Sequence, residues 1–263
     1  MSGVSTRRYH ALLLVARHPP QDRIVLVNHL SEWLDTSQGP VFLSSARGHG
    51  PPEDGYRHCV GFVARPAAEW RYEVDGMTMT RTIVCARGRD AVVVRWQITG
   101  RHRKAVRLFV RPMLTVRPAD AVVSATDAIS SSFENDGGRV SWQPRSTFPR
   151  VFVWGARDYD HSPAWRRGVD YSIDRERGEP ADEDWWSPGT LSVVVAPDAP
   201  AFLAFTTEDD VFVDAAASFE RELDRRLASN KPARSTGSLG RLHDALIAGA
   251  ESYIVEVDDR VAL

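Results

Sequence analysis

WRYEVDGMTMTRTIVCARGRDAVVVRWQI, residues 70–98, is the stretch that decides the fold. Apolar side chains alternate with polar ones in three runs, at 70–74, 77–86 and 91–98. Such period-two alternation is typical of β-strands that bury one face. Asp75-Gly76 between the first two runs is a hairpin signal, and residues 87–90 supply a second turn. The stretch therefore predicts an antiparallel meander.

Strand patterns continue on both sides of this meander. Upstream, residues 11–16 and 23–30 predict a hairpin whose connection holds Pro19 and Pro20, and residues 58–64 predict a short strand. Downstream, strand patterns recur at 106–110, 133–142, 151–154, 191–195 and 201–205. Residues 37–52, rich in Gly, Ser and Pro, and residues 158–188, dense in aromatic and acidic side chains, are expected to be loops.

The end of the chain has a helical pattern instead. One apolar stripe recurs every three or four residues, at Phe212, Ala216, Phe219, Leu223 and Leu227. A second helix is expected from Ser238, with apolar positions at Leu239, Leu242, Leu246 and Tyr253. Strands followed by helices, without βαβ alternation, predict a mainly β protein, an antiparallel β-sandwich with two C-terminal helices. We expect the sandwich to span residues 1–209 and the helices to form a linker over residues 210–263.

Composition narrows the function classes. A chain of 263 residues can bury a large core, and its net charge of −2 gives no reason to expect nucleic acid or a membrane as partner. No run approaches the roughly 20 apolar residues of a membrane helix, and the N-terminus lacks a signal-peptide pattern. Cys59 and Cys85 fit neither a disulfide framework nor a metal site, which favours the cytoplasm. Histidine spacing and the lack of phosphate-binding motifs predict no metal and no cofactor.

Residues 5–16 place a polar cluster directly before an apolar strand. Arg7, Arg8, Tyr9 and His10 would gather at the mouth of that strand. The plainer interpretation is a charged patch that solvates the end of the sheet, because Arg and Tyr are common on surfaces. The alternative is a surface that binds a ligand through its polar groups.

A second candidate site lies within residues 158–188. Glu183 and Asp184 are residues of the type that glycosidases use as acid and base. Sequence neighbours point in different directions, however, and a carboxylate-rich loop is more often solvated. Trp165, Trp185 and Trp186 either stack on a sugar ring from the surface or pack in the core. Together with the polar cluster, Glu183 to Trp186 form the predicted substrate-binding set, and no catalytic residue is assigned.

Three ordered blocks of the chain carry a family resemblance. They are TRRYHALL at 6–13 with RIVL at 23–26; WRY at 70–72, RTIV at 81–84, VVRW at 93–96 and RPMLTVR at 111–117; and RERG at 175–178 with EDWWSPG at 183–189. In this order the blocks resemble the bacterial and archaeal glycogen debranching enzymes, the amylo-alpha-1,6-glucosidase family. They extend over most of the chain.

The resemblance implies an N-terminal β-sandwich of the glucoamylase-like super-sandwich kind. In that family the sandwich precedes an α/α-barrel that carries the catalytic acids for hydrolysis of α-1,6-glucosidic branches. Because the chain ends before such a barrel, no catalytic residue is carried over, and we expect the chain alone to be inactive. The leading hypothesis is therefore a non-catalytic domain of a glycoside hydrolase.

Such a domain would support the catalytic barrel, in cis or in trans, and contact an α-glucan such as glycogen or a malto-oligosaccharide. A stand-alone carbohydrate-binding module using Arg8, Tyr9, His10, Trp185 and Trp186 is the alternative hypothesis. A third is an interaction domain whose helices dock a separately encoded barrel. An apolar helix stripe and an open sheet edge would also favour a homodimer.

Overall fold

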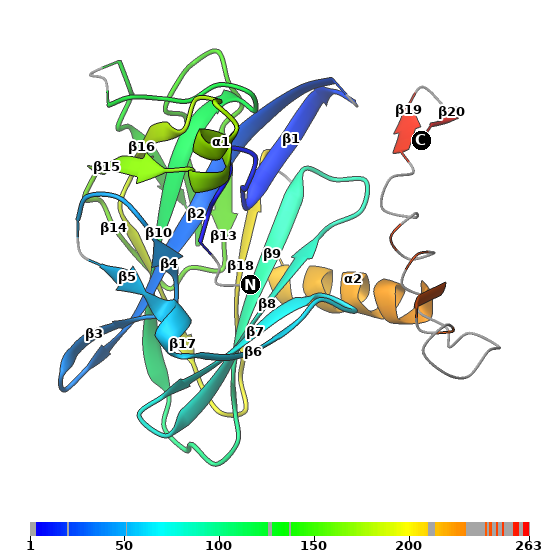
Figure 1. Cartoon of the computed structure of the whole chain (residues 1–263). Helices are drawn as coiled ribbons and strands as arrows, with labels where there is room; N and C mark the ends of the chain where they lie inside the picture. Colours follow the sequence, from blue (N-terminus) through cyan, green and yellow to red (C-terminus); the bar gives the residue numbers. More distant parts are fainter. Residues whose placement is uncertain are drawn as a thin grey trace.

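The computed structural model describes most of the chain. It covers residues 4–19, 21–50, 52–125, 128–136, 138–209 and 214–229, and single residues or short stretches at 240, 242–243, 246, 249, 255–257 and 260–262. Within these residues the strands form two large antiparallel sheets of eight strands each (Figure 1). The predicted fold class, a mainly β sandwich, is therefore confirmed.

The first sheet is built around two long neighbouring strands, β2 and β10. Its strand order is β1-β2-β10-β16-β15, with β3 paired to β2, β17 to β10, and β14 to β17. Its strands are β1 (Leu13–His18), β2 (Gln21–Thr36), β3 (Gly39–Phe42), β10 (Val106–Pro118), β14 (Asp158–Asp160), β15 (Ala164–Asp170), β16 (Asp182–Ser187) and β17 (Thr190–Val195).

The second sheet contains the predicted meander and has the order β11-β12-β13-β18-β9-β8-β7-β6. Its strands are β6 (Cys59–Val63), β7 (Ala68–Val74), β8 (Met77–Cys85), β9 (Ala91–Thr99), β11 (Phe133–Asp136), β12 (Arg139–Trp142), β13 (Val151–Trp154) and β18 (Ala201–Thr206). Asp75 and Gly76 both take positive φ, 47° and 73°, so the β7–β8 hairpin has the left-handed turn that its sequence predicts.

The other elements lie outside these two sheets. They are β4 (Ser45–Ala46), β5 (Glu53–Asp54), a 3-10 turn at Gly55–Arg57, α1 (Ser172–Glu176), α2 (Ala215–Ser229), β19 (Val255–Val257) and β20 (Arg260–Ala262). No helix among the described residues is long and apolar enough to cross a membrane.

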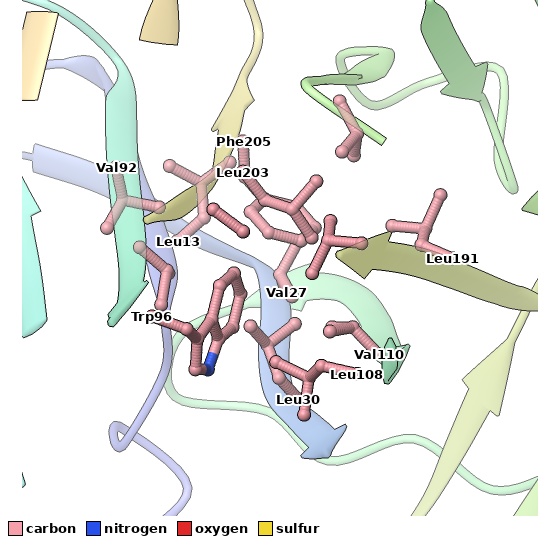
Figure 2. Close-up of a cluster of buried hydrophobic side chains, with 14 of the residues drawn as sticks. Leu13, Val27, Leu30, Val92, Trp96, Leu108, Val110, Leu191, Leu203 and Phe205 are labelled. Atoms are coloured by element: carbon pink, nitrogen blue, oxygen red, sulfur yellow. The ribbon is translucent and has the colours of Figure 1, made fainter. Parts of the chain in front are cut away.

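The two sheets meet in one apolar core, which makes the architecture a sandwich. Figure 2 shows the side chains that interlock there, with the first sheet contributing Leu13, Val27, Leu30, Leu108, Val110 and Leu191 and the second contributing Val92, Trp96, Leu203 and Phe205. Trp96 and Phe205 are fully buried. A fully buried side chain of this size stabilises the fold by about 1.5–3 kcal/mol, so the core is the main source of stability.

Helix α2 lies against the outer face of the second sheet, beside β8, β9 and β18 (Figure 1). Phe219 is fully buried there, with its ring 5.5 Å from that of Phe202. The predicted stripe holds as far as Leu223, whereas Leu227 in the last turn is 51% exposed. Phe212 lies outside the described residues. The described residues of the second predicted helix are helical at 240, 242–243, 246 and 249, and its other residues lie outside the described part.

The expectation of a long loop at residues 158–188 is wrong. This segment forms β14, β15, α1 and β16, and β15 pairs with β16 through Trp165 and Trp186. Strand β16 buries side chains on both faces, so it lacks the alternation that reveals a half-exposed strand. Residues 37–52, also expected to be a loop, contain the short strands β3 and β4.

Candidate functional site

The N-terminal motif is anchored to the protein through Arg8. Its backbone N–H donates to Asp174 Oδ2 at 2.7 Å, and its guanidinium donates to Glu179 at 3.0 Å. The carbonyl of Thr6 accepts from the Ile173 N–H at 3.1 Å. Arg8 is 6% exposed and Asp174 is 2% exposed. The motif is therefore fixed against α1 and the turn that follows it.

A buried ion pair lies behind this anchor. Arg117 and Glu183 form a bidentate pair, and Arg117 Nη2 also donates to the Arg8 carbonyl at 2.9 Å. Glu183 also accepts from the Val123 N–H at 3.0 Å and from the hydroxyl of Tyr171. Every oxygen of the carboxylate is occupied, which is the condition under which a buried ion pair is tolerated. Glu183 thus holds strands together and offers no free oxygen to a substrate.

A backbone irregularity aims Arg117 inward. The register of β10 against β2 shifts between Leu114 and Arg117, and Val116 has a φ of 47°. A β-branched residue is strained in this left-handed region, and bulges of this kind redirect side chains. The strain is offset by the buried bonds that Arg117 makes.

The remaining residues of the EDWWSPG block are also structural. Asp184 accepts from the N–H groups of Ala125 at 2.7 Å and Gly168 at 2.9 Å, so both of its oxygens are used. Trp185 is fully buried and Trp186 is 4% exposed. The expectation that Glu183, Trp185 and Trp186 present a sugar-binding surface is corrected by their burial, because neither ring offers a face to a ligand.

The residues of the polar cluster face different ways. Arg8 points inward, Arg7 is half-buried, and Tyr9 and His10 are exposed. Arg8 Nη2 donates to the Tyr9 hydroxyl at 3.1 Å, and the Arg8 guanidinium carbon lies 5.0 Å from the Tyr9 ring centre. Tyr9 is thereby held in one orientation at the surface. Sugar contact by Arg7, Tyr9, His10 and Asp184 stays a prediction.

A cavity of about 460 Å³ opens next to this cluster. The N-terminal segment, β2 and the neighbouring strands β7 and β8 all contribute to its lining. Its lining residues are Val4, Ser5, Thr6, His10, Ala11, Leu12, Asn28, His29, Leu30, Trp70, Arg81 and Ile83. A volume of this size is typical of small-molecule sites. The N-terminal motif therefore contributes to a cavity wall.

A second polar cluster, which the sequence did not reveal, includes the cavity-lining His29. Glu53 accepts hydrogen bonds from Ser31 at 2.6 Å, Ser44 at 2.8 Å and Arg166 at 2.7 Å, and it pairs with His29 Nε2 at 3.1 Å. Burial alone would raise the pKa of Glu53, but the hydrogen bond and charge of His29, the charge of Arg166 and the Ser31 bond lower it to about 2. The cluster fixes the cavity-lining His29, whose ring also stacks on Trp185 at 5.2 Å.

A third group couples the cavity to the opposite sheet. Glu32 of β2 is fully buried, and its Oε1 lies 3.1 Å from Nε of the cavity-lining Arg81 on β8. Neither carboxyl oxygen of Glu32 makes a hydrogen bond of ordinary geometry. The same holds for the nitrogens that face it, Arg81 Nε and Trp96 Nε1. Burial raises the pKa of Glu32 to about 7, with the Arg81 charge opposing the rise and that of Glu53 adding to it.

The buried carboxylates do not present a free oxygen to the cavity. Glu183, Asp184 and Glu53 are each saturated by donors, and Glu32 does not line the cavity. Among the described residues, no group of three or more His, Cys, Asp and Glu side chains could hold a metal ion.

The Glu53 cluster could not be predicted from the sequence, because Glu53 and Arg166 are 113 residues apart.

Comparison with known proteins gives one family match. The model of a family described as the N-terminal part of glycogen debranching enzyme matches residues 1–201. A bacterial glucoamylase crystallised with acarbose is 8% identical, with a TM-score of 0.45 over 97% of this chain and 37% of that chain. A protein from the human microbiome assigned as a kojibiose phosphorylase is 5% identical, with a TM-score of 0.33 over 90% of this chain and 30% of that chain.

The chain thus spans about a third of the length of either structure. The search of curated proteins finds no significant match. The family match covers the Arg-Arg-Tyr-His segment, the meander and the EDWWSPG block, which are the parts that build the cavity wall and its supports. The chain belongs to the family of glycogen debranching enzyme N-terminal domains.

Proposed function

We propose that this domain is the non-catalytic part of a glycogen-debranching-type glycoside hydrolase, where it supports an α/α-barrel and contacts the α-glucan. The observation that carries the proposal is the family match over residues 1–201. The hydrolysis of α-1,6 branches would belong to the barrel, in the same chain or in a separate one. The expected compartment is the cytoplasm, and both Cys59 and Cys85 are free thiols.

Glucan contact is proposed for the surface beside the cavity. Tyr9 is 40% exposed and is held by Arg8 from both its hydroxyl and its ring face. A preordered aromatic ring loses little conformational entropy when a pyranose stacks on it. His10 follows directly and lines the cavity, so its imidazole could hydrogen-bond to a hydroxyl of the same sugar. Trp185 and Trp186 have no part in this contact because they are buried.

Calorimetric titration with maltohexaose tests the glucan contact. We expect weak but measurable binding by the 263-residue chain and its loss in Tyr9→Ala. Tyr56→Ala, which removes another tyrosine that is 50% exposed, is the matched control and should bind normally. Absence of heat with millimolar maltohexaose would overturn the contact.

A second assay tests the non-catalytic role. Purified chain should release no glucose from limit dextrin, and robust metal-free turnover would overturn this part of the proposal.

Self-association is a further element of the proposal. Strand β6 lies at the edge of the second sheet, and Val60 and Val63 on it are 54% and 49% exposed. An exposed apolar edge strand favours pairing with another chain. Light scattering at micromolar concentration should show a dimer that Val60→Lys/Val63→Lys dissociates. A wild-type monomer would remove this element.

A further inference from the structure

The described lining of the cavity holds basic side chains and no acidic ones. Its titratable residues are Arg81, His10 and His29, and among the described residues that line it there is no Asp or Glu. The three come from separate parts of the chain, namely β8, the N-terminal segment and β2. A concave surface with one sign of charge and low-dielectric walls concentrates ligands of the opposite charge.

Arg81 is held in place as a fixed cation. Its guanidinium carbon lies 5.2 Å from the centre of the Trp70 ring, which is itself packed against Phe62 at 5.0 Å. Its side chain is 12% exposed, and Nε makes no hydrogen bond of ordinary geometry despite its closeness to Glu32. A preordered guanidinium is well suited to phosphate, because its planar fork matches the phosphate oxygens.

The two histidines are oriented by their neighbours. His10 Nδ1 faces the Thr6 N–H at 3.3 Å, so the neutral ring that accepts this bond carries its proton on Nε2 and can donate it to a ligand. His29 is fixed by the Glu53 carboxylate and by stacking on Trp185. Apolar side chains of Leu12, Leu30 and Ile83 complete the walls and favour a ligand with a compact organic body over a bare ion.

From this geometry we propose that the cavity binds a monophosphate ester of a small molecule such as a hexose, with Arg81 as its main cation. Glu32 acts as an internal counter-ion that gives up its charge when the ligand arrives. The occupied state holds the anion against Arg81 and a neutral carboxyl at Glu32. Binding therefore takes up a proton from solvent. This ligand shares His10 with the proposed glucan contact but depends on Arg81, whereas the glucan contact depends on Tyr9, so either proposal can fail without the other.

The surroundings of Glu32 allow such an exchange. Arg81 of β8, Glu53 of β5, Tyr72 of β7 and Trp96 of β9 face it. Of these, the Arg81 charge and the nearby Trp96 indole lower the pKa of Glu32, while burial and the Glu53 charge raise it. With the pKa at about 7, an anion near Arg81 can shift the carboxyl to its neutral form near physiological pH.

Calorimetry of the full chain tests the proposal with three probes: glucose 6-phosphate, glucose 6-sulfate and glucose. The sulfate ester keeps its charge between pH 6 and pH 8, so its binding reports on protein groups alone. We expect both anions to bind, the sulfate ester about tenfold more tightly at pH 6 than at pH 8, and glucose to show no such dependence. Titration in two buffers of different ionisation enthalpy should reveal proton uptake at pH 8.

Variants test the roles of Glu32 and Arg81 separately. Glu32→Gln should bind the sulfate ester at pH 8 about tenfold more tightly than wild type, without the proton uptake attributable to Glu32. The double variant Glu32→Gln/Arg81→Gln removes both charges together and should lose anion binding with its circular dichroism unchanged. Arg71→Gln, on the exposed part of β7, is the matched control. The proposal is overturned if wild type binds neither anion, if the folded double variant still binds, or if Glu32→Gln keeps the wild-type proton uptake.

Discussion

Two buried glutamates of the same sandwich, Glu53 and Glu32, have pKa values shifted in opposite directions. Glu53 is met by Ser31, Ser44, His29 and Arg166. Glu32 has one close cation and no hydrogen bond of ordinary geometry to its carboxyl. The two are neighbours, since the Ser44 hydroxyl that donates to Glu53 also accepts the Glu32 N–H at 2.9 Å. Both carboxyl groups are therefore buried in the same region, and they differ in the number of hydrogen-bond donors that surround them.

The pKa values express this difference. The pKa of Glu53 is about 2 and that of Glu32 about 7, against an ordinary 4.5. Glu53 contributes stability above pH 4.5 that is lost as pH falls towards 2. Glu32 does the opposite, because its folded form holds a proton that the unfolded chain has already released between pH 4.5 and 7. The ionised Glu32 carboxylate lowers the free energy of unfolding by its full amount above pH 7, and this loss disappears as the pH falls towards 4.5. Ionised Glu53 therefore stabilises the fold, whereas ionised Glu32 destabilises it and lies beside a cavity.

The largest effect is expected for Glu53→Gln. The change removes the buried carboxylate that both Arg166 and His29 contact, and loss of one member of a buried pair costs about 3–5 kcal/mol. Urea unfolding at neutral pH measures the free energy. Glu220→Gln, which removes an exposed carboxylate of α2 that pairs with Arg95 of β9, is the control and should change stability by less than about 0.5 kcal/mol. A cost for Glu53→Gln below about 1 kcal/mol would show that the cluster is not a unit.

A smaller effect of opposite sign is expected for Glu32→Gln. At pH 8 the substitution removes a buried charge that the folded state accommodates poorly, and stability should rise by about 1–3 kcal/mol. At pH 5 the carboxyl is neutral in the folded state, and the difference should shrink towards zero. Urea unfolding at both pH values gives the comparison. A larger loss of stability at pH 8 than at pH 5 would contradict the assignment.

Ser31→Ala should have the smallest effect of the three. It removes one donor from Glu53 and leaves the others, so the cost should be about 1 kcal/mol. The pKa of Glu53 should rise at the same time, which a purely steric effect would not cause. Ser37→Ala, in the exposed turn after β2, controls for the loss of a hydroxyl. An unchanged Glu53 pKa would show that Ser31 does not act through the carboxylate.

The fold was predictable where apolar and polar residues alternate along a strand. The Trp70–Ile98 meander and its Asp75-Gly76 turn appear in the structure at the expected places. Prediction failed where both faces are covered, as in β16, whose consecutive Glu183, Asp184 and Trp185 resemble a polar loop. Strand β2 is similar, since its polar Ser31 and Glu32 interrupt the pattern although both are buried.

The site was less predictable because its polar groups find partners far along the chain. Glu53 comes from a Gly- and Pro-rich segment that reads as loop, and its partner Arg166 belongs to a different strand. The Arg-Arg-Tyr-His motif was visible as a cluster, yet its residues divide between an inward anchor and an outward surface. Sequence spacing cannot show that division, since it depends on the position of Asp174 and Glu179.

Carboxyl carbon NMR titration of the wild-type chain tests the central claim most directly, with Glu32→Gln and Glu53→Gln used to assign the two signals. Glu32 should titrate with a midpoint near 7, which glucose 6-sulfate should raise further, while Glu53 should stay ionised well below pH 4. A Glu32 midpoint at or below 4.5, or one that the anion does not move, would contradict the account.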